Sequence, residues 1–327
     1  MLFEWRALTK NDVGTWAKLL ADVERADRVG ENYGADDLAD DLDNPLLDLA
    51  EGTLAAWDGD RMVAFGLTAC RPAADPVHQM NLWGAVHPDY RRRGLGGHLL
   101  DWAIRNTPVL HGRRFPGRPL ELLMSVFEGN EGATALVARA GMTPVRWFYG
   151  MSHDLGSEIP AIPATTPATG LPGGLRIVPY REDMEEAARQ VRNLSFADHW
   201  GSVPHTPESW KSSIVGVQAF RPEGSFLAQE ESGKIVAVLL THYFEADTEV
   251  TGVREAWVQI IGTLREWRGR GVAGALLAHA LTEFRAQGYG KAGLGVDAAN
   301  PTGALGLYTR AGFKVEHRTA TYMLPLG

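Results

Sequence analysis

One stretch in the second half of the chain reads Arg268-Gly269-Arg270-Gly271-Val272-Ala273; it follows an apolar run and opens an amphipathic segment. The first half contains the same arrangement, Arg91-Arg92-Arg93-Gly94-Leu95-Gly96. Both fit the pattern R-x-x-G-x-[GA]. A glycine-rich turn into a helix N-terminus exposes free N–H groups at the positive end of the helix dipole, which favours a phosphate or pyrophosphate. The repeat predicts a duplicated domain that binds a phosphorylated cofactor.

Length and charge limit the possible classes of protein. The chain has 327 residues, of which 45% are hydrophobic, and this length predicts two domains. The formal net charge is -8, and no long Lys/Arg run offsets it. Nucleic acid is therefore not an expected partner.

The cysteine content and the hydropathy pattern predict a cytoplasmic protein. Cys70 is the only cysteine, so no disulfide can form within the chain, in agreement with a reducing compartment. Cys70 could be catalytic, although a small buried apolar residue of a strand is the simpler interpretation. The N-terminus does not resemble a signal peptide, and no apolar stretch approaches the ~18 residues that a membrane span needs.

A proline-rich segment divides the chain into two halves of similar size. Residues 156–174 contain Pro160, Pro163, Pro167 and Pro172, with Ala, Thr and Gly between them. This composition is typical of a semi-extended linker. We therefore predict an N-terminal domain over 1–155, a linker over 156–174 and a C-terminal domain over 175–327.

The two halves show the same order of strand and helix patterns. Each begins with a short strand and a polar helix, continues with a hairpin and a long apolar strand, and then reaches the glycine loop and its helix. Another strand, a helix that ends at Gly141 or Gly312, and a last strand follow. We expect each half to be an α/β unit with a mixed sheet, closed by its own last strand, Val145–His153 or His317–Leu324.

Residues downstream of the second loop show a family resemblance. The segment Asn300–Phe313 contains an Asn, then Leu-Tyr-x-x-x-Gly-Phe, in order and about 30 residues after the loop. Together with R-x-x-G-x-A, this resembles the GNAT superfamily of acyl-CoA-dependent N-acetyltransferases, and the two halves together extend the resemblance over nearly the whole chain. It implies two GNAT-like domains, each with a twisted, mixed, mostly antiparallel sheet flanked by helices.

The resemblance implies roles for residues of the second half. Transfer of acetyl from a thioester to an amine needs a held cofactor, a donor to the oxyanion and a path for the proton. Tyr308 matches the tyrosine that protonates the departing thiolate. Acetyl-CoA would be held by backbone amides around Ile260 and Ile261, by the arginines and amides of the loop, and by Asn300. The alternative for Asn300 is that it only caps a helix that begins near Thr302. The predicted loop contacts are Arg268, Arg270, Gly271, Val272, Ala273 and Gly274.

The general base and the acceptor site are less sharply defined. Glu255 lies at the start of the strand before the loop, where the family often places a Glu base, and counting by two puts Trp257 on the same face. His199 and His242 are competing bases, and an exposed strand-end carboxylate is the simpler interpretation of Glu255. We expect His199, Trp200 and Trp257 to contact the acceptor, although packing would equally explain His199 beside Trp200.

The first half departs from the family pattern. Its loop is at least as good a pyrophosphate site, but Val137 stands where the tyrosine belongs, and His78 corresponds to Glu255. Valine cannot deliver a proton, so this half is expected to bind acetyl-CoA without catalysis; a different acid, or a purely scaffolding role, would also fit. The predicted contacts are Val86, Arg91, Arg93, Gly94, Leu95, Gly96 and Gly97.

The sequence thus predicts an acetyl-CoA-dependent N-acetyltransferase acting on a primary amine of a small molecule. The alternatives are an enzyme for the cysteinyl amine of a glucosamine–inositol conjugate, which some two-domain family members acetylate, a protein N-acetyltransferase, or an acyl-CoA-binding module without turnover. The histidines are scattered and no His/Cys cluster occurs, so we expect no metal. We expect a monomer or a homodimer.

Overall fold

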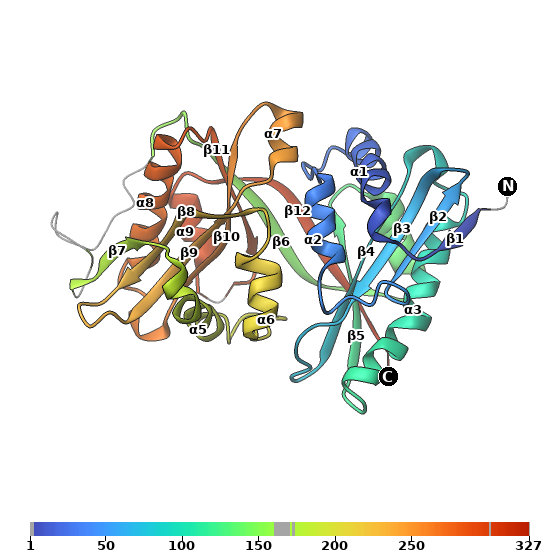
Figure 1. Ribbon diagram of the computed structural model, residues 1–327, viewed down its shortest axis with the longest axis horizontal. Coiled ribbons are helices and arrows are strands. Elements are labelled where there is room, and N and C mark those ends of the chain that lie inside the picture. Colours follow the sequence, from blue (N-terminus) through green and yellow to red (C-terminus); the bar gives the residue numbers. More distant parts are fainter. Residues whose placement is uncertain (1–2, 160–170, 172–173, 301, 327) are drawn as a thin grey trace. The chain divides into compact units, whose positions relative to one another are not determined.

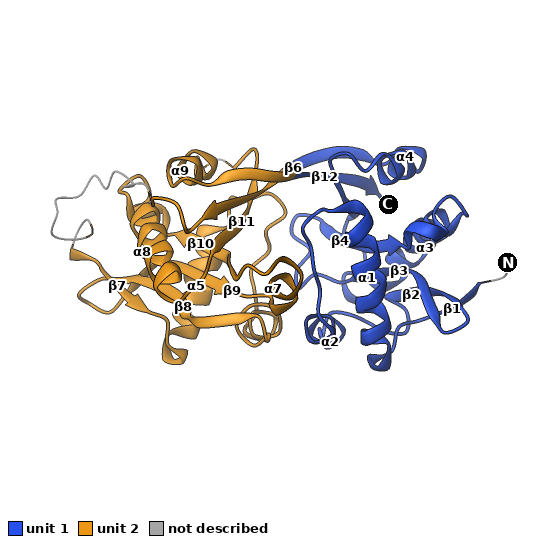
Figure 2. Cartoon of the chain, turned by 90° about the horizontal axis from the view of Figure 1, so that it is seen from above, with its two compact units in different colours: residues 1–147, 318–327 blue, residues 148–317 orange. Residues whose placement is uncertain are grey.

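The chain forms two compact units in a computed structural model that describes residues 3–159, 171, 174–300 and 302–326. Unit 1 consists of Met1–Trp147 with Arg318–Gly327, and unit 2 of Phe148–His317; Figure 2 shows them in blue and orange. Of the predicted linker 156–174, positions 160–170 and 172–173 lie outside the described residues. None of the described helices is long and apolar enough to cross a membrane.

Unit 1 is a six-stranded sheet with helices on both faces. The strand order is β1-β2-β3-β4-β5-β12, and every pair is antiparallel except β4 with β5. Its elements, labelled in Figure 1 except for α4, which Figure 2 labels, are β1 (Glu4–Arg6), α1 (Val13–Asp27), α2 (Ala35–Leu42), β2 (Thr53–Asp58), β3 (Arg61–Ala69), β4 (His78–Val86), α3 (Leu95–Arg114), β5 (Leu120–Phe127), α4 (Glu131–Arg139) and β12 (Lys314–Pro325).

Side chains alternate between the two faces of the sheet along the strands of unit 1, so that a separate hydrophobic core lies on each face. Phe65 on β3 faces α1 and packs edge-on against Trp16, with ring centroids 5.0 Å apart. The next residue, Gly66, faces α3, where a Cβ would meet Leu99 and Trp102. Because successive side chains of a strand point to opposite faces, α1 and α3 cover opposite faces of this sheet.

Unit 2 repeats the plan. Its strand order is β7-β8-β9-β10-β11-β6, again antiparallel except for β10 with β11. β9 is buried at all of its residues, as expected for a strand with helices over both faces. The elements are β6 (Thr143–Asp154), β7 (Arg176–Pro179), α5 (Glu185–Ser195), α6 (Pro207–Trp210), β8 (Phe220–Gln229), β9 (Ile235–His242), α7 (Glu245–Thr251), β10 (Glu255–Thr263), α8 (Val272–Ala286), β11 (Lys291–Asp297) and α9 (Ala304–Arg310).

The last strands are exchanged between the two halves of the sequence. In β6, Phe148–Asp154 pairs with Lys291–Asp297 of β11, so the N-terminal half supplies the sixth strand of unit 2. In β12, Thr319–Pro325 pairs with Glu121–Phe127 of β5, so the C-terminal half completes unit 1. The expectation that each half closes with its own last strand is therefore wrong. The mixed, mostly antiparallel sheets flanked by helices are confirmed.

Candidate active site

Two neighbouring parallel strands of unit 2 separate along their length. β10 pairs with β11 from Glu255–Lys291 as far as Val258–Leu294, and its last residues have no partner in β11. At the same point the register of β10 against β9 shifts between Val258 and Ile260, which marks a bulge at Gln259. Ile260 and Ile261 stay paired with β9 alone, so alternate backbone N–H groups on the other edge face the gap. The splay thus lies at Ile260 and Ile261, whose backbone amides the family resemblance implies as cofactor contacts.

The glycine loop connects the splayed end of β10 to α8. Gly269 and Gly271 have φ of 71° and 82°, a region that favours glycine, and Gly271 is the N-cap of α8 without a side-chain capping bond. The first helical hydrogen bond runs from the Ala275 N–H to the Gly271 carbonyl. The N–H groups of Val272, Ala273 and Gly274 therefore have no partner within the helix.

The two arginines of this loop have different surroundings. Arg268 is turned inward: its Nε donates to the Thr263 carbonyl at 3.2 Å, and its guanidinium donates to the Ser195 carbonyl at 2.7 Å. Arg270 is exposed and lies over the Trp267 ring, 5.1 Å from its centroid. Arg268 therefore fixes the loop to β10 and α5, whereas Arg270 leaves its charge accessible to a ligand.

Unit 1 builds its loop in the same way. Arg92 and Gly94 have φ of 62° and 88°, at the places of Gly269 and Gly271. Arg91 donates from Nε to the Val86 carbonyl at 3.2 Å, and its guanidinium donates two hydrogen bonds of 2.7 Å to the Asp27 carboxylate. The Arg93 guanidinium lies over the Tyr90 ring, 4.8 Å from its centroid. The first arginine again bonds to groups of the protein, and the second again lies on an aromatic ring. The backbone of the predicted loop contacts, Gly94, Leu95, Gly96 and Gly97, begins α3 as its equivalents begin α8.

Tyr308 lies in α9 and is 5% exposed. Burial raises the pKa of its phenol above the ordinary value, so the group stays protonated at neutral pH. Its hydroxyl makes no hydrogen bond with any residue that the structure describes. A protonated, otherwise uncommitted phenol is suited to donate a proton.

Asn300 follows β11 in the turn that precedes α9. Its Oδ1 accepts hydrogen bonds from the backbone N–H and the hydroxyl of Thr302, at 2.8 and 2.6 Å. α9 begins later, at Ala304, with Gly303 as N-cap. Asn300 therefore shapes this turn, and the suggestion that it caps a helix beginning near Thr302 is wrong.

Glu255 belongs to a charged cluster at the far end of β10 from the loop. Lys291 lies between two carboxylates, 3.1 Å from Glu255 Oε2 and 2.8 Å from Glu316 Oε2. Burial raises the pKa of Glu255, opposed by the Lys291 charge. Ile260 lies five positions after Glu255 along the strand, about 16 Å at ~3.3 Å per strand residue. The structure therefore does not bring Glu255 to the splayed part of the strand.

Trp257 shares a face of β10 with Glu255, as predicted. A Cβ on Gly293 of β11 would lie 2.0 Å from Glu255 Oε1 and 2.8 Å from Trp257 Cε3. Glycine at this position thus lets both side chains lie across β11. Trp257 also donates from Nε1 to Gln259 Oε1 at 3.0 Å, on the bulge, so its half-buried ring extends toward the splay.

The segment after α5 brings His199 and Trp200 to the end of β11. Burial is the largest of the causes that lower the pKa of the His199 ring. The charge of Arg268 lowers this pKa as well, and the charge of Asp297 raises it. Trp200 lies against Phe148 of β6, with centroids 6.3 Å apart. His242, by contrast, is a core residue: its Nε2 lies 2.8 Å from the Ile214 carbonyl oxygen. This removes His242 from the candidate bases.

In unit 1, the residues that correspond to Tyr308 and Glu255 have structural roles. Val137 is fully buried in the core. His78 Nε2 accepts from the Arg71 N–H at 3.1 Å, which leaves the proton on Nδ1, 2.8 Å from Nδ1 of His111. His111 Nε2 in turn lies 2.9 Å from the Arg118 carbonyl oxygen. Both rings are thus committed to a buried chain of hydrogen bonds.

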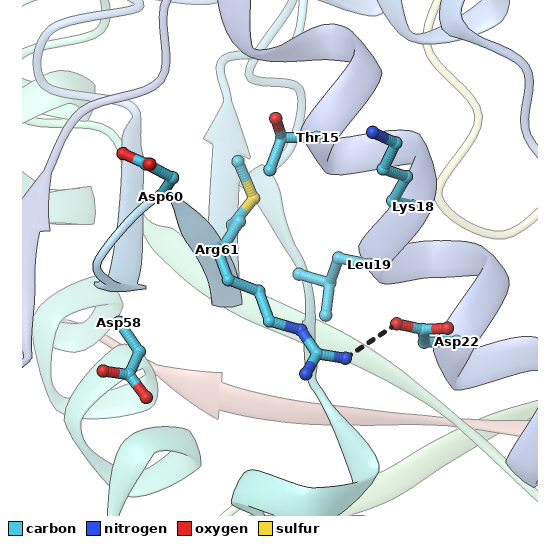
Figure 3. A pocket seen from close by; sticks show the side chains of 8 residues that line it. Thr15, Lys18, Leu19, Asp22, Asp58, Asp60 and Arg61 are labelled. Atoms are coloured by element: carbon cyan, nitrogen blue, oxygen red, sulfur yellow. Dashed lines mark hydrogen bonds and ion pairs between the residues drawn. The ribbon is translucent and has the colours of Figure 1, made fainter.

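A cavity of about 430 Å³ in unit 1 is lined by residues of α1 and of the turn between β2 and β3 (Figure 3). Its lining residues are Thr15, Lys18, Leu19, Asp22, Asp58, Asp60, Arg61 and Met62. Asp22 accepts from Arg61 at 3.0 Å, and Asp58 accepts from the Tyr90 hydroxyl at 2.7 Å. These contacts fix the turn before Arg91 and explain the polar lining.

Thr263 is a candidate that the sequence analysis missed. It ends β10, is 8% exposed, and its hydroxyl has no hydrogen-bond partner among the described residues. The equivalent position in unit 1 is Val86, since both carbonyls accept from the first arginine of their loop. A threonine in place of a valine in otherwise matching loops was the available signal. No group of three or more potential metal ligands occurs in the part of the chain that was described.

Both halves of the chain are similar to known proteins. A family model described as "Acetyltransferase (GNAT) family" matches residues 16–142 and 186–313. A mycothiol acetyltransferase of Thermobispora bispora is 31% identical over 80% of this chain and 79% of its own length. A second, from Parafrankia sp., is 27% identical over 98% and 97% of the two chains.

Solved structures show the same architecture over the full length. A GCN5-related N-acetyltransferase from Sphaerobacter thermophilus superposes with a TM-score of 0.72 at 28% identity, covering 99% of this chain and 96% of its own. A tandem GNAT protein from the clavulanic acid biosynthesis pathway superposes with a TM-score of 0.71 at 19% identity, covering 100% and 99%. The latter likeness concerns the fold alone.

Proposed function

Because the chain belongs to the acetyltransferase (GNAT) family and is an N-acetyltransferase, we propose that unit 2 transfers an acetyl group from acetyl-CoA to a primary amine of a small molecule. The observation that carries this proposal is the splay of β10 from β11, which leads directly into the Gly271 N-cap of α8 in the unit that also contains Tyr308. Unit 1 has the loop and the splay but has Val137 in place of the tyrosine.

The residues of unit 2 fit acetyl-CoA. The free N–H groups of Val272, Ala273 and Gly274 would hold its pyrophosphate, with Arg270 adding positive charge. Arg268 contributes by holding the loop in place. Acetyl-CoA supplies an acetyl group that is activated as a thioester. An unpaired N–H at Ile260 or Ile261 would donate to the thioester carbonyl, and Asn300 would contact the pantetheine arm.

Proton movement involves two sides of the gap. The Tyr308 hydroxyl would give its proton to the departing thiolate, a role that its uncommitted, protonated phenol supports. On the acceptor side, Trp257, Trp200 and His199 would line the amine. His199 is our candidate to accept the amine proton, because its ring lies in the field of Asp297 and its lowered pKa keeps it neutral.

We further propose that unit 1 binds acetyl-CoA without transferring it. Its loop repeats the backbone conformation of the second loop, and the accessible Arg93 corresponds to Arg270. Val86 would contribute backbone contacts at the end of β4. No residue at the place of Tyr308 can donate a proton there, since Val137 is aliphatic.

The similarity to mycothiol acetyltransferases favours one specific acceptor. In that second candidate function the chain is a mycothiol synthase, and the amine is that of a cysteinyl glucosamine–inositol conjugate. A protein N-acetyltransferase is the other enzymatic alternative. An acyl-CoA-binding role without turnover is less well supported, because Tyr308 and Asn300 are both present.

The test is an acetylation screen followed by a single substitution. The amines are aminoglycosides, amino acids, polyamines and cysteinyl glucosaminides. With the acceptor that reacts best, Tyr308→Phe should lower kcat about a hundredfold or more while acetyl-CoA affinity is unchanged. Tyr180→Phe, which removes a hydroxyl from the core of the same unit, is the matched control and should leave kcat unchanged. Equal turnover in both variants would remove Tyr308 from the mechanism.

Calorimetric titration with acetyl-CoA separates the two units. We expect two sites in the wild type, and loss of one site each in Gly271→Val and Gly94→Val, because a β-branched side chain does not tolerate the positive φ of these N-caps. A single site in the wild type would contradict cofactor binding by unit 1. Binding without acetylation of any amine in the screen would favour the non-catalytic module.

A further inference from the structure

The side chain that ends β10 is polar and buried where its counterpart in unit 1 is apolar. Thr263 and Val86 occupy equivalent positions, each accepting from its loop arginine through the backbone carbonyl at 3.2 Å. Thr263 is 8% exposed and its hydroxyl bonds to none of the described residues. Burying a hydroxyl without a partner costs free energy, so such a group calls for a physical reason.

The position of the side chain supplies that reason. In unit 1, Val86 Cγ2 lies 3.8 Å from the point where a Cβ on Gly96 would stand, in the first turn of α3. The equivalent residues of unit 2 are Thr263 and Ala273, in the first turn of α8. By this equivalence we place the Thr263 side chain beside the first turn of α8, whose N–H groups of Val272, Ala273 and Gly274 have no intrahelical partner.

Other partnerless buried hydroxyls show why the location matters. Thr68 and Thr107 of unit 1 also have buried hydroxyls without a partner among the described residues, but they lie on β3 and in the body of α3. Thr263 alone among these three sits where a splayed strand meets a glycine loop. Its hydroxyl and the free N–H groups of α8 would converge on the same bound group.

We propose that the Thr263 hydroxyl donates a hydrogen bond to an oxygen of the bound CoA arm, so that unit 2 holds the cofactor through a side-chain contact that Val86 cannot provide in unit 1. This inference rests on the proposed function, in which unit 2 binds acetyl-CoA. It assigns to one residue an affinity difference between two loops whose backbones are otherwise alike. Thr263 acts here as a binding residue and takes no part in proton transfer.

The experiment compares two threonine-to-valine substitutions in the full-length chain. Calorimetric titration with acetyl-CoA and with CoA gives affinity, and urea unfolding of the ligand-free protein gives stability. Gly94→Val serves as the background in which only the site of unit 2 is titrated. Thr263→Val should weaken Kd for both ligands about tenfold, because one hydrogen bond to the cofactor is lost. Its stability should be unchanged or higher, because no internal hydrogen bond is broken.

Thr241→Val is the matched control. The Thr241 hydroxyl is fully buried but donates to the Gly224 carbonyl at 2.7 Å, so this variant should lose stability and keep its affinity. Thr263→Ser retains the hydroxyl and should retain the wild-type Kd. Unchanged Kd in Thr263→Val, with binding intact in the background protein, would overturn this inference alone. Absence of acetyl-CoA binding in the background protein would overturn the proposed cofactor site of unit 2 together with it.

Discussion

The guanidinium of Arg268 donates a hydrogen bond to the backbone carbonyl oxygen of Ser195 across 2.7 Å. The first arginine of the loop therefore points into the protein and joins the end of β10 to the end of α5. Its neighbour two positions later, Arg270, is exposed over Trp267. The two arginines of one motif thus have separable functions.

Alanine substitutions distinguish these functions. Arg268→Ala should lower the free energy of unfolding by about 1–3 kcal/mol, since bonds from a largely buried guanidinium to two carbonyl oxygens are lost. Arg270→Ala should leave stability within about 0.5 kcal/mol and weaken acetyl-CoA binding instead. Urea unfolding and calorimetry on both variants check this. Equal stability loss in the two variants would contradict the inward assignment of Arg268.

Glu255→Gln tests whether the carboxylate is a general base. We expect kcat to change less than about threefold, because the side chain is committed to Lys291 and lies before the splay. Removal of a true base would lower kcat about 10²–10⁴-fold and abolish one limb of the pH–rate profile. His199→Gln is the companion variant, and we expect the larger loss there. A large loss confined to Glu255→Gln would restore Glu255 as the base.

The buried histidine pair of unit 1 predicts an acid-sensitive stability. Burial, with the nearby charges of His111 and Arg71, lowers the pKa of His78 to about 4, against about 6.5 in an unfolded chain. Below about pH 6.5 the unfolded state takes up the proton first, so stability is complete above that pH and falls toward pH 4. The slope is about 1.4 kcal/mol per pH unit for this group. Urea unfolding at pH 7 and 5 should show the loss, and a His78 NMR signal that titrates near 6.5 would contradict it.

Strand exchange predicts that the linker is not needed to keep the halves together. A protease site inserted between residues 160 and 170 of the full chain would be cut and the product analysed by size exclusion. Because β6 completes unit 2 and β12 completes unit 1, the two fragments should elute as one particle and separate only in denaturant. Local closure, with each half using its own last strand, would instead release two half-sized fragments.

A pair of substitutions in the cut chain sharpens this test. Met151 is a buried residue of β6 within the core of unit 2, so Met151→Ser should lower the urea concentration at which the fragments separate. Val315 is 40% exposed in β12, and Val315→Ser should have little effect.

Much of the fold could be predicted because its signals are local. The Gly271 turn, the apolar stripe of α8 and the alternation in β10 depend on residues close in sequence, and the structure has all three. The family segment around Tyr308 was found for the same reason. Thr263 was missed because a threonine in place of a valine in matching loops indicates a ligand contact only once its hydroxyl is seen to be buried without a partner among the described residues.

The sequence by itself determined two α/β units, each with a glycine loop that starts a helix, and the difference between Tyr308 and Val137. Only the tertiary structure decided which sheet each last strand joins, because the period-two pattern of β6 is the same beside β11 as it would be beside β5. The tertiary structure likewise turned Arg268 inward and left the Thr263 hydroxyl without a hydrogen-bond partner among the residues that the structure describes. Both outcomes depend on atoms of residues distant in sequence, which no local pattern records.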